Sequence, residues 1–254
     1  MTGLRCGAVL GALFAALCPG VHAQVATQPD GQWRALVGAA YSRTSGNANA
    51  STLSVKADAA RATPDDKWTL HAEALRARTE GVTSGNRARV DGRYDWNLSP
   101  RTFSFGSAGA ERDTIALLDS RLSLGAGLGY KLIDRPETSF NVFGGLSFTD
   151  DRYAEPRLIG DRLRDHYGRP TAVLGEESTH KFNASTSANQ RLVLNPDLSS
   201  TPVHTAQWDA GLAVAMTRTM NLTFGVSVHY SSVPGAGLKN TDTLVTTGVA
   251  VKFD

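Results

Sequence analysis

Residues 120–132 of the chain read SRLSLGAGLGYKL, and this stretch decides the fold class. Apolar side chains occupy every second position, and arginine, serine, lysine and glycine occupy the positions between them. The apolar set is Leu122, Leu124, Ala126, Leu128, Tyr130 and Leu132, and the other set is Arg121, Ser123, Gly125, Gly127, Gly129 and Lys131. Successive side chains of a strand point to opposite faces, so the stretch predicts a β-strand with one apolar and one polar face.

Segments of the same kind recur along the chain and bring the count to about twelve. They lie at 32–43, 51–61, 67–78, 87–97, 102–112, 120–132, 138–149, 171–181, 186–194, 208–217, 222–231 and 242–253. Their lengths match that of a tilted membrane strand, about 9–11 residues. The sequence therefore predicts an all-β fold built from long strands.

The expected connections alternate between short and long. Short ones fall at 62–66, 98–101, 133–137, 182–185 and 218–221, and longer ones at 44–50, 79–86, 113–119, 150–170, 195–205 and 232–241. Short turns at one rim and long loops at the other are typical of outer-membrane barrels, whose short turns face the periplasm. An even strand count places both termini on that side. The prediction is a transmembrane antiparallel up-and-down β-barrel of about 12 strands with both termini periplasmic.

Aromatic residues of the apolar faces gather near the predicted strand ends, as they do at the two interfaces of a membrane. The short-turn rim has Trp33, Trp68, Trp96, Phe103, Tyr130, Phe140, Phe224 and Phe253, and the long-loop rim has Tyr41, Phe148, Trp208 and Tyr230. The main alternative is a soluble barrel or sandwich whose apolar face points inward. It is disfavoured because a soluble core has no reason to confine its aromatic residues to strand ends.

The N-terminal residues predict export. An apolar run over 8–17 leads to a small-x-Ala cleavage pattern, so residues 1–23 are expected to be a secretory signal peptide. Residues 24–31 then form a short lead, and residues 32–254 form the barrel domain.

The composition excludes several classes of protein. The chain has 26 Lys and Arg against 24 Asp and Glu, and its formal net charge of +2 gives no electrostatic case for nucleic acid. Its two cysteines, Cys6 and Cys18, lie in the expected signal peptide, so a disulfide-stapled fold is excluded. No apolar run after residue 23 approaches the roughly 20 residues of a helical span. Strands are left as the means of crossing a membrane, which places the protein in the bacterial outer membrane.

If the apolar face meets lipid, the polar face lines the lumen. The expected lumen-lining charges are Lys56, Asp58, His71, Glu73, Arg89, Asp91, Arg93, Asp95, Arg112, Arg121 and Asp209. The alternating signs within 89–95 would let neighbouring strands pair charges across the sheet. Buried charges are tolerated only when paired, which favours a narrow or plugged lumen. The alternative is a small polar pore, a porin-like passive channel lined by both signs.

The sequence gives little support for catalysis, and we predict no enzyme activity, no cofactor and no metal site. His71 with Glu73, and His229 with Ser227 or Ser231, are neighbours on an inner face. Such pairs arise freely in a serine-rich polar face and do not assemble a nucleophile, a base and an orienting group. A lipid-acting barrel enzyme and a soluble periplasmic binding barrel are the less favoured alternatives.

The stretch LGEESTHKF, residues 174–182, interrupts the alternation. Glu176 and Glu177 are adjacent, so a regular strand turns one of the two carboxylates toward lipid. We therefore expect a β-bulge that brings both inside. Glu176 and His180 alone are too few ligands for a metal site.

The longest expected loop, 150–170, is rich in Asp and Arg. Charged outer loops can bridge the phosphates of lipopolysaccharide through Arg pairs or divalent ions. The bland alternatives are a solvated loop and a loop that folds into the barrel mouth.

The stretch YSSVPGAGLKNTDTLVTTGVAVKF, residues 230–253, resembles the closing strand pair of the salt-induced outer-membrane protein family. SGNANASTLSVKADA, residues 45–59, resembles that family's first external turn and second strand. LGAGLGYKLID, LGEESTHKF and QWDAGLAVAMTRTMNLTFGVSVHY fit its later strands. The resemblance covers about residues 32–253 and implies a single outer-membrane barrel with no assigned reaction and a link to salt or osmotic stress.

The resemblance also implies an assembly signal in the last strand, at Val249, Val251 and Phe253. Barrels of this kind usually stop on the aromatic residue that the barrel-assembly machinery reads, and Asp254 departs from that pattern. The closing strand is expected to pair with the first, around 33–41, because pairing removes exposed sheet edges. Besides the assembly machinery, the expected partners are outer-membrane lipid and lipopolysaccharide.

Overall fold

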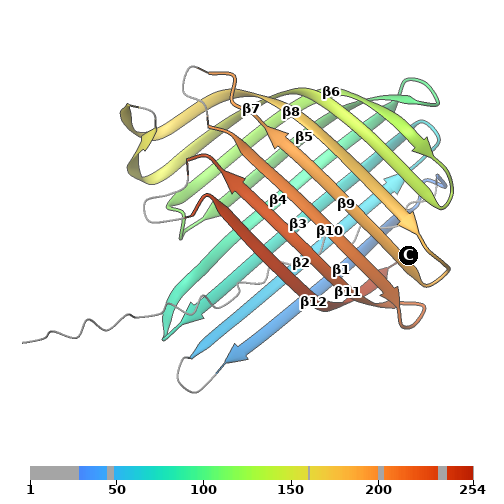
Figure 1. The fold of residues 1–254 in the computed structure, drawn as a ribbon, viewed down its shortest axis with the longest axis horizontal. Coiled ribbons are helices and arrows are strands. Elements are labelled where there is room, and N and C mark those ends of the chain that lie inside the picture. Colours follow the sequence, from blue (N-terminus) through green and yellow to red (C-terminus); the bar gives the residue numbers. More distant parts are fainter. Residues whose placement is uncertain (1–28, 45–48, 160, 200–202, 234–238, 254) are drawn as a thin grey trace, which may run out of the picture.

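The computed structural model describes residues 29–44, 49–159, 161–199, 203–233 and 239–253, and every regular element in this part is a β-strand. Twelve strands, each antiparallel to its neighbours, close into one barrel (Figure 1). The predicted fold class, an all-β up-and-down barrel of about 12 strands, is confirmed. The described residues contain no helix that is long and apolar enough to cross a membrane.

The strands follow the alternating segments of the sequence, and most run longer than expected. They are β1 (Trp33–Thr44), β2 (Ala50–Ala62), β3 (Asp66–Thr79), β4 (Val82–Asn97), β5 (Thr102–Asp113), β6 (Leu118–Asp134), β7 (Thr138–Ile159), β8 (Arg162–Lys181), β9 (Thr186–Asn195), β10 (Thr205–Ala215), β11 (Met220–Ser231) and β12 (Thr241–Phe253). The expected signal peptide, residues 1–23, and the terminal Asp254 lie outside the described residues.

The barrel closes where β12 pairs with β1, as the sequence predicts. The register runs from Ala35 opposite Phe253 to Ala39 opposite Val249, so the barrel begins and ends at the same rim. Over these five residue pairs, closure satisfies N–H and C=O groups of both edge strands, which could not remain unpaired in lipid.

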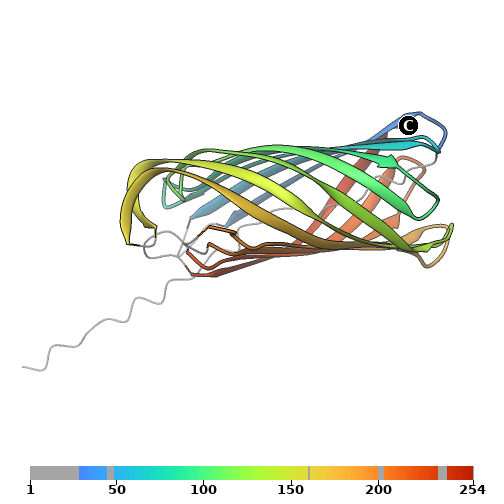
Figure 2. The ribbon, with the colours of Figure 1, turned by 90° about the horizontal axis from the view of Figure 1, so that it is seen from above.

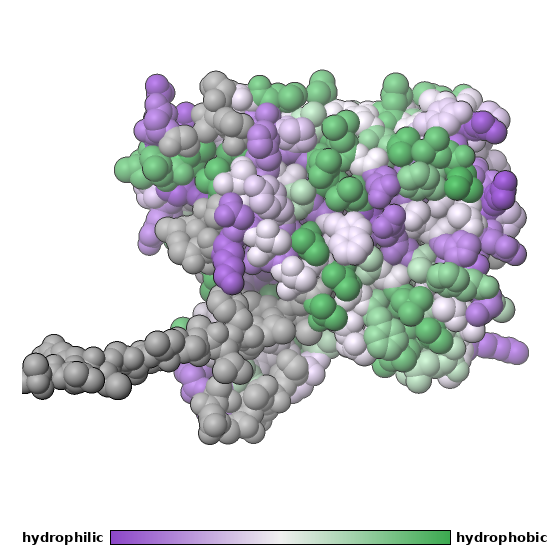
Figure 3. Space-filling view, viewed as in Figure 1, coloured by the Kyte–Doolittle hydropathy of each residue, from purple (hydrophilic) through white to green (hydrophobic). Residues whose placement is uncertain are grey.

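Alternation along the strands places apolar side chains on the outside of the ring. Leu124 and Val245 are 67% and 63% exposed, whereas Thr246, on the opposite face from Val245, is 5% exposed. Figure 3 shows apolar patches on the outer wall that β9–β12 form, with polar side chains between them. A soluble barrel would have its apolar face inside, so this arrangement favours a wall that meets lipid.

The region 150–170 was expected to be a loop, and this prediction is wrong because the region is a hairpin of two paired strands. β7 and β8 continue to pair beyond the outward-facing Phe148 and turn only between Ile159 and Arg162. The hairpin, yellow in Figures 1 and 2, projects at one end of the barrel. Pairing continues because backbone hydrogen bonds need no apolar face, and side chains such as Asp150 and His166 also pair across the two strands.

The expected loop 79–86 is also wrong, because β3 and β4 join in a tight turn. Glu80 and Gly81 have φ values of 51° and 80°. Positive φ at both central residues is the conformation of a two-residue type I′ hairpin turn. Long connections at this rim are therefore fewer than the sequence suggests.

The expected position of Phe103 on the outer wall is wrong. Its side chain is 3% exposed and clusters inside the barrel with Phe105 and Phe143. Phe103 and Phe105 share a face with Glu111, which lies opposite Arg89 of β4 and Arg121 of β6. Because Glu111 pairs with charged residues on the inner face, this face of β5 points inward, and Phe103 and Phe105 on the same face point inward too.

Inner glycines make room for these rings. A Cβ atom at Gly129 would lie 2.0 Å from Phe103 Cζ, and one at Gly175 would lie 2.4 Å from Phe143 Cζ. Each large ring therefore occupies the space above a residue that has no side chain.

The expected bulge at Glu176 and Glu177 is absent. The pairing of β8 with β7 and with β9 is regular through this segment. Glu177 shares the inner face with Asn141, whose amide donates to it at 3.2 Å. Glu176 lies on the opposite face, where Gln190 donates to its carboxylate at 3.3 Å. The outward carboxylate of Glu176 is thus satisfied by a hydrogen bond from Gln190 on the neighbouring strand β9.

We predict that Gly129→Ala destabilises the barrel by roughly 1–3 kcal/mol, the usual cost of overpacking. The reason is the clash of the new methyl group with the Phe103 ring. Urea unfolding of the refolded protein, followed by heat-modifiable gel mobility, measures the change. Gly106→Ala is the matched control, because a Cβ there meets no atom within 4 Å. Equal stability of the two variants would contradict the packing assignment.

Candidate functional site

The inner face of β2 and β3 carries two charge pairs. Lys56 Nζ lies 3.6 Å from Glu73 Oε2, and His71 Nδ1 lies 2.7 Å from Asp58 Oδ1. The members of each pair are directly opposite one another in the two strands. On these strands the charges pair directly across the sheet.

In β4 the charges pair along the strand instead, so the expected cross-strand pairing of 89–95 is wrong. Arg89 donates to Asp91 at 2.6 and 3.1 Å, and Arg93 donates to Asp95 at 2.7 Å. Partners two residues apart share one face of a strand. Each long arginine side chain folds back to the carboxylate of its own strand.

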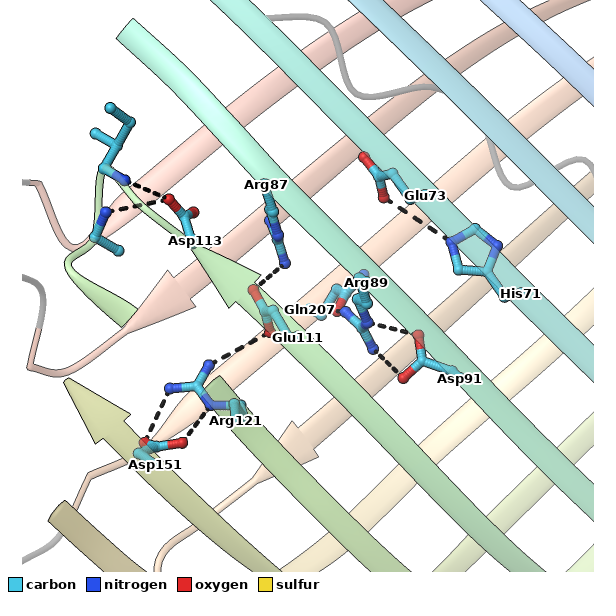
Figure 4. A network of polar contacts seen from close by, with 12 residues as sticks. His71, Glu73, Arg87, Arg89, Asp91, Glu111, Asp113, Arg121, Asp151 and Gln207 are labelled. Carbon is cyan, nitrogen blue, oxygen red and sulfur yellow. Dashed lines mark hydrogen bonds and ion pairs between the residues drawn. The ribbon is translucent and has the colours of Figure 1, made fainter. Parts of the chain in front are cut away.

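A chain of ion pairs runs around the wall near the start of β4 and β6 and toward the end of β5 and β7 (Figure 4). Arg87 Nη2 lies 2.8 Å from Glu111 Oε1, and Glu111 Oε2 lies 3.6 Å from Arg121 Nη1. Arg121 in turn donates to Asp151 at 2.6 and 3.0 Å. Four strands, β4 to β7, are therefore connected by alternating charges.

Asp151 is the hub of this chain. Its side chain is fully buried and accepts hydrogen bonds from Arg121, from Arg169 at 2.7 Å and from Tyr153 at 2.9 Å. A buried carboxylate is tolerable only with such partners. The site thus depends on residues of the β7–β8 hairpin that were expected to lie in a loop.

One hydrogen bond crosses the lumen. Arg89 of β4 donates to Gln207 Oε1 of β10 at 3.1 Å, although these two strands are not neighbours in the sheet. Gln207 donates to Asp209 at 2.8 Å, and Ser227 of β11 donates to the same carboxylate. Opposite walls therefore meet at this level, and the lumen is narrow there.

Arg93 forms a second constriction with aromatic rings. Its guanidinium carbon lies 4.5 Å from the ring centres of both Phe105 and Phe143. Phe143 belongs to β7, which is not a neighbour of β4. Arg93 is 9% exposed, and its Nη1 and Nη2 atoms have no hydrogen-bond partner among the described residues. Cation–π attraction to the two rings takes the place of those bonds.

The β7–β8 hairpin contacts loops elsewhere on the rim. Ile159 and Tyr167 are buried together with Val203, and Val233 packs against this cluster. Arg157 Nη2 also donates to the carbonyl oxygen of Val233 at 3.2 Å. Figure 2 shows the hairpin curving at the end of the barrel. The hairpin thus joins the connections before β10 and after β11 across the mouth.

The expected position of Arg112 in the lumen is wrong. Arg112 is exposed and lies opposite Ala88, on the face of β5 away from Phe105 and Glu111. The charge that β5 contributes to the inside is Glu111. The error has the same cause as that for Phe103, because the faces of β5 are exchanged relative to the sequence prediction.

Of the histidine pairs considered for catalysis, His71 Nε2 lies 3.9 Å from Glu73 Oε2, and its Nδ1 makes the closer contact with Asp58. In the other pair, Ser227 donates to Asp209. His180 was considered as a metal ligand, and its Nδ1 lies 2.6 Å from Thr138 Oγ1. Among the described residues no group of three or more His, Cys, Asp or Glu side chains could hold a metal ion.

Sequence reasoning missed Asp151, Arg169 and Gln207. A usable signal was present for Asp151, because Ser147, Thr149 and Asp151 continue the polar face of the 138–149 segment without interruption. For Gln207 no local signal exists, since its contact with Arg89 joins residues that only barrel closure brings together.

The chain also has sequence relatives. Residues 37–253 match the model of the family described as "Protein of unknown function, DUF481". The chain belongs to this family. No curated protein matches the DUF481 chain. The expected membership of an outer-membrane family without an assigned reaction is supported in this coarse form, and the salt-induced name stays a prediction.

The DUF481 barrel is similar in architecture to several solved barrels. The NanC porin is 12% identical over 86% of this chain and 97% of its own, with a TM-score of 0.45. The translocator domain of the autotransporter NalP from Neisseria meningitidis is 12% identical over 87% and 88%, with a TM-score of 0.49. The KdgM porin is 9% identical over 88% and 99%, with a TM-score of 0.43. Likeness at this level concerns the fold alone.

We predict that Asp151→Asn destabilises the barrel by about 3 kcal/mol, the low end of the usual cost of breaking a buried ion pair. The variant loses the carboxylate that Arg121 and the buried Arg169 share, and each arginine keeps only a more distant partner, Glu111 at 3.6 Å and Asp197 at 3.9 Å. Urea unfolding measures the loss, and limited proteolysis should show earlier cleavage in the β7–β8 hairpin. Asp161→Asn is the matched control, since the Asp161 side chain is 87% exposed. A stability equal to that of the control would contradict the role of Asp151 as hub.

Proposed function

We propose that the chain is an integral outer-membrane β-barrel whose polar lumen is closed, or nearly closed, at rest. The observation that carries the proposal is the meeting of non-neighbouring strands inside the ring, at Arg89 with Gln207 and at Arg93 with Phe143. The exposed apolar wall supports insertion into lipid, since apolar surface left in water costs about 25 cal/mol per Å². The ion-paired side chains and the aromatic rings of the inner wall occupy the lumen and keep it narrow.

We place the rim that holds both barrel ends in the periplasm. Its five turns, between β2 and β3 and at each second connection thereafter, are three or four residues long, whereas the opposite rim carries the β7–β8 hairpin. Short periplasmic turns and larger external structures are the usual polarity of such barrels. Export by the expected signal peptide, residues 1–23, fits this orientation.

The closing strand presents the proposed assembly signal. Val249, Val251 and Phe253 point outward from β12 and are exposed. They are therefore accessible to a partner that recruits the last strand before it pairs with β1. We assign this contact to the barrel-assembly machinery.

A small polar pore is the second candidate. The side chains of Arg89 and Asp91 are 27% and 32% exposed, so part of the inner wall is open to water-sized molecules. A pore with these walls would discriminate little between cations and anions, because both signs of charge line it.

The resemblance to the salt-induced family suggests a role in osmotic stress. Under this proposal the abundance of the protein rises when external salt is raised, which quantitative immunoblotting of membrane fractions measures. Constant abundance across salt concentrations would remove the link and leave the barrel proposal intact.

We predict that the protein separates with the outer-membrane fraction, requires detergent for extraction and migrates faster on gels before heating than after. These properties follow from the apolar wall and the closed hydrogen-bonded ring. A protein that stays soluble without detergent would overturn the membrane proposal.

We predict a low conductance for refolded protein in planar bilayers and a severalfold higher conductance for Arg93→Ala and for Phe143→Ala. Each change removes one side of the constriction between β4 and β7. Arg112→Ala is the matched control, because it also removes an arginine side chain, but from the outer wall and not from the lumen. If the lumen variants conduct no more than this control, the constriction does not lie at Arg93.

A further inference from the structure

Two arginines of β3 stand on the outer wall without a partner. Arg76 and Arg78 are exposed, and neither has an ion pair or side-chain hydrogen bond within the described part of the chain. Inside the barrel, by contrast, Arg87, Arg93 and Arg121 each contact a carboxylate. These three inner arginines are therefore neutralised by the barrel's own carboxylates, whereas the guanidinium groups of Arg76 and Arg78 are available to a ligand outside the barrel.

A hollow beside these arginines has hydroxyl groups as well as charge. Arg76 and Arg78 line it together with Tyr41, Ser51 and Leu53, and its volume is about 250 Å³. The five residues come from β1, β2 and β3, where Leu53 lies opposite both Tyr41 and Arg76 and where Ser51 lies opposite Arg78. Backbone pairing in three adjacent strands fixes their spacing. The chemistry of the hollow, two guanidinium groups with two hydroxyl donors, suits a phosphate.

The hollow lies at the border of the apolar wall. Along β2 and β3 toward the other rim, the next outward residues are Val55 on β2 and Ala74, Ala72 and Leu70 on β3. Val55 and Leu70 are exposed. Tyr41, which is 65% exposed, marks the aromatic level near the rim opposite the chain ends. Lipid head groups meet a barrel at this level.

Of the five arginines in the 150–170 region, four contact a carboxylate or a backbone carbonyl, and the fifth, Arg164, lies over the ring of Tyr167. In the β7–β8 hairpin, Arg169 pairs with Asp151, Arg152 lies 3.7 Å from Asp150, and Arg157 donates to a backbone carbonyl. The hairpin therefore offers less unpaired positive charge than β3 does.

We propose that Arg76 and Arg78, with the hydroxyl groups of Tyr41 and Ser51, bind a phosphate group of lipopolysaccharide on the outer wall of the barrel. This inference rests on the proposed function, because it requires the rim opposite the chain ends to lie in the outer leaflet. The sugar–phosphate head group would sit over the guanidinium groups, and its acyl chains would lie along Leu53, Val55 and Leu70.

The test uses the full mature chain, refolded in detergent, and native mass spectrometry with three probes: purified lipopolysaccharide, the same lipid after phosphatase treatment, and phosphatidylglycerol. The double variant Arg76→Gln/Arg78→Gln should bind lipopolysaccharide at least about tenfold more weakly than wild type, the factor lost with one charge-assisted hydrogen bond. Removal of the phosphates should weaken wild-type binding in the same way and leave the double variant little changed.

The matched control is Arg135→Gln/Arg218→Gln, which removes two exposed arginines from turns at the opposite rim. It should bind like wild type. The proposal is overturned if the two double variants bind lipopolysaccharide equally, or if wild type binds phosphatidylglycerol as tightly as lipopolysaccharide. Gel mobility before and after heating is recorded for wild type and for each variant, and binding is compared between proteins that keep the folded barrel. A wild-type protein without heat-modifiable mobility would count against the proposed function, whereas equal binding by folded variants would count against this site.

Discussion

The pairing of β12 with β1 is the contact on which the rest of the barrel depends. From Ala35–Phe253 to Ala39–Val249, the two ends of the chain supply each other with the backbone partners that both would otherwise lack. An open sheet would expose two rows of N–H and C=O groups, and no lipid could satisfy them. Once the ring is closed, every strand residue points either into the lumen or out of the barrel, and the alternation along each strand separates the polar inner face from the apolar outer face.

Closure creates two environments that treat the same residue type differently. Arg121 points inward and is held by Glu111 and Asp151, whereas Arg76 points outward and has no partner in the described chain. Inside, charge must be neutralised by the protein because little water is present. At the outer border, the surrounding head groups can supply the counter-charge. The position of an arginine relative to the ring therefore decides whether it stabilises the barrel or is available to bind a ligand.

Aromatic rings fill the barrel interior, and glycines on neighbouring strands leave room for them. Phe103 and Phe143 project into the ring, and Gly129 and Gly175 on neighbouring strands leave the space that the rings need. Arg93 then packs against Phe105 and Phe143 and connects walls that share no backbone hydrogen bonds. Twelve strands enclose more room than eight, and this protein uses large side chains and ion pairs to reduce it.

The sequence by itself determined the strand type, the strand number, the outward apolar face and the closing pair, because these depend only on a period of two and on edge removal. It misassigned β5, placing Phe103 and Arg112 on the wrong faces, because short side chains occupy both faces of that strand. It missed the hub at Asp151, because β7 and β8 continue beyond the length that crosses a membrane, and the expected strand ended at residue 149. Only the tertiary structure decided which walls meet, as at Arg89 and Gln207, since contacts across a lumen follow from the radius and stagger of the closed ring and from no local pattern.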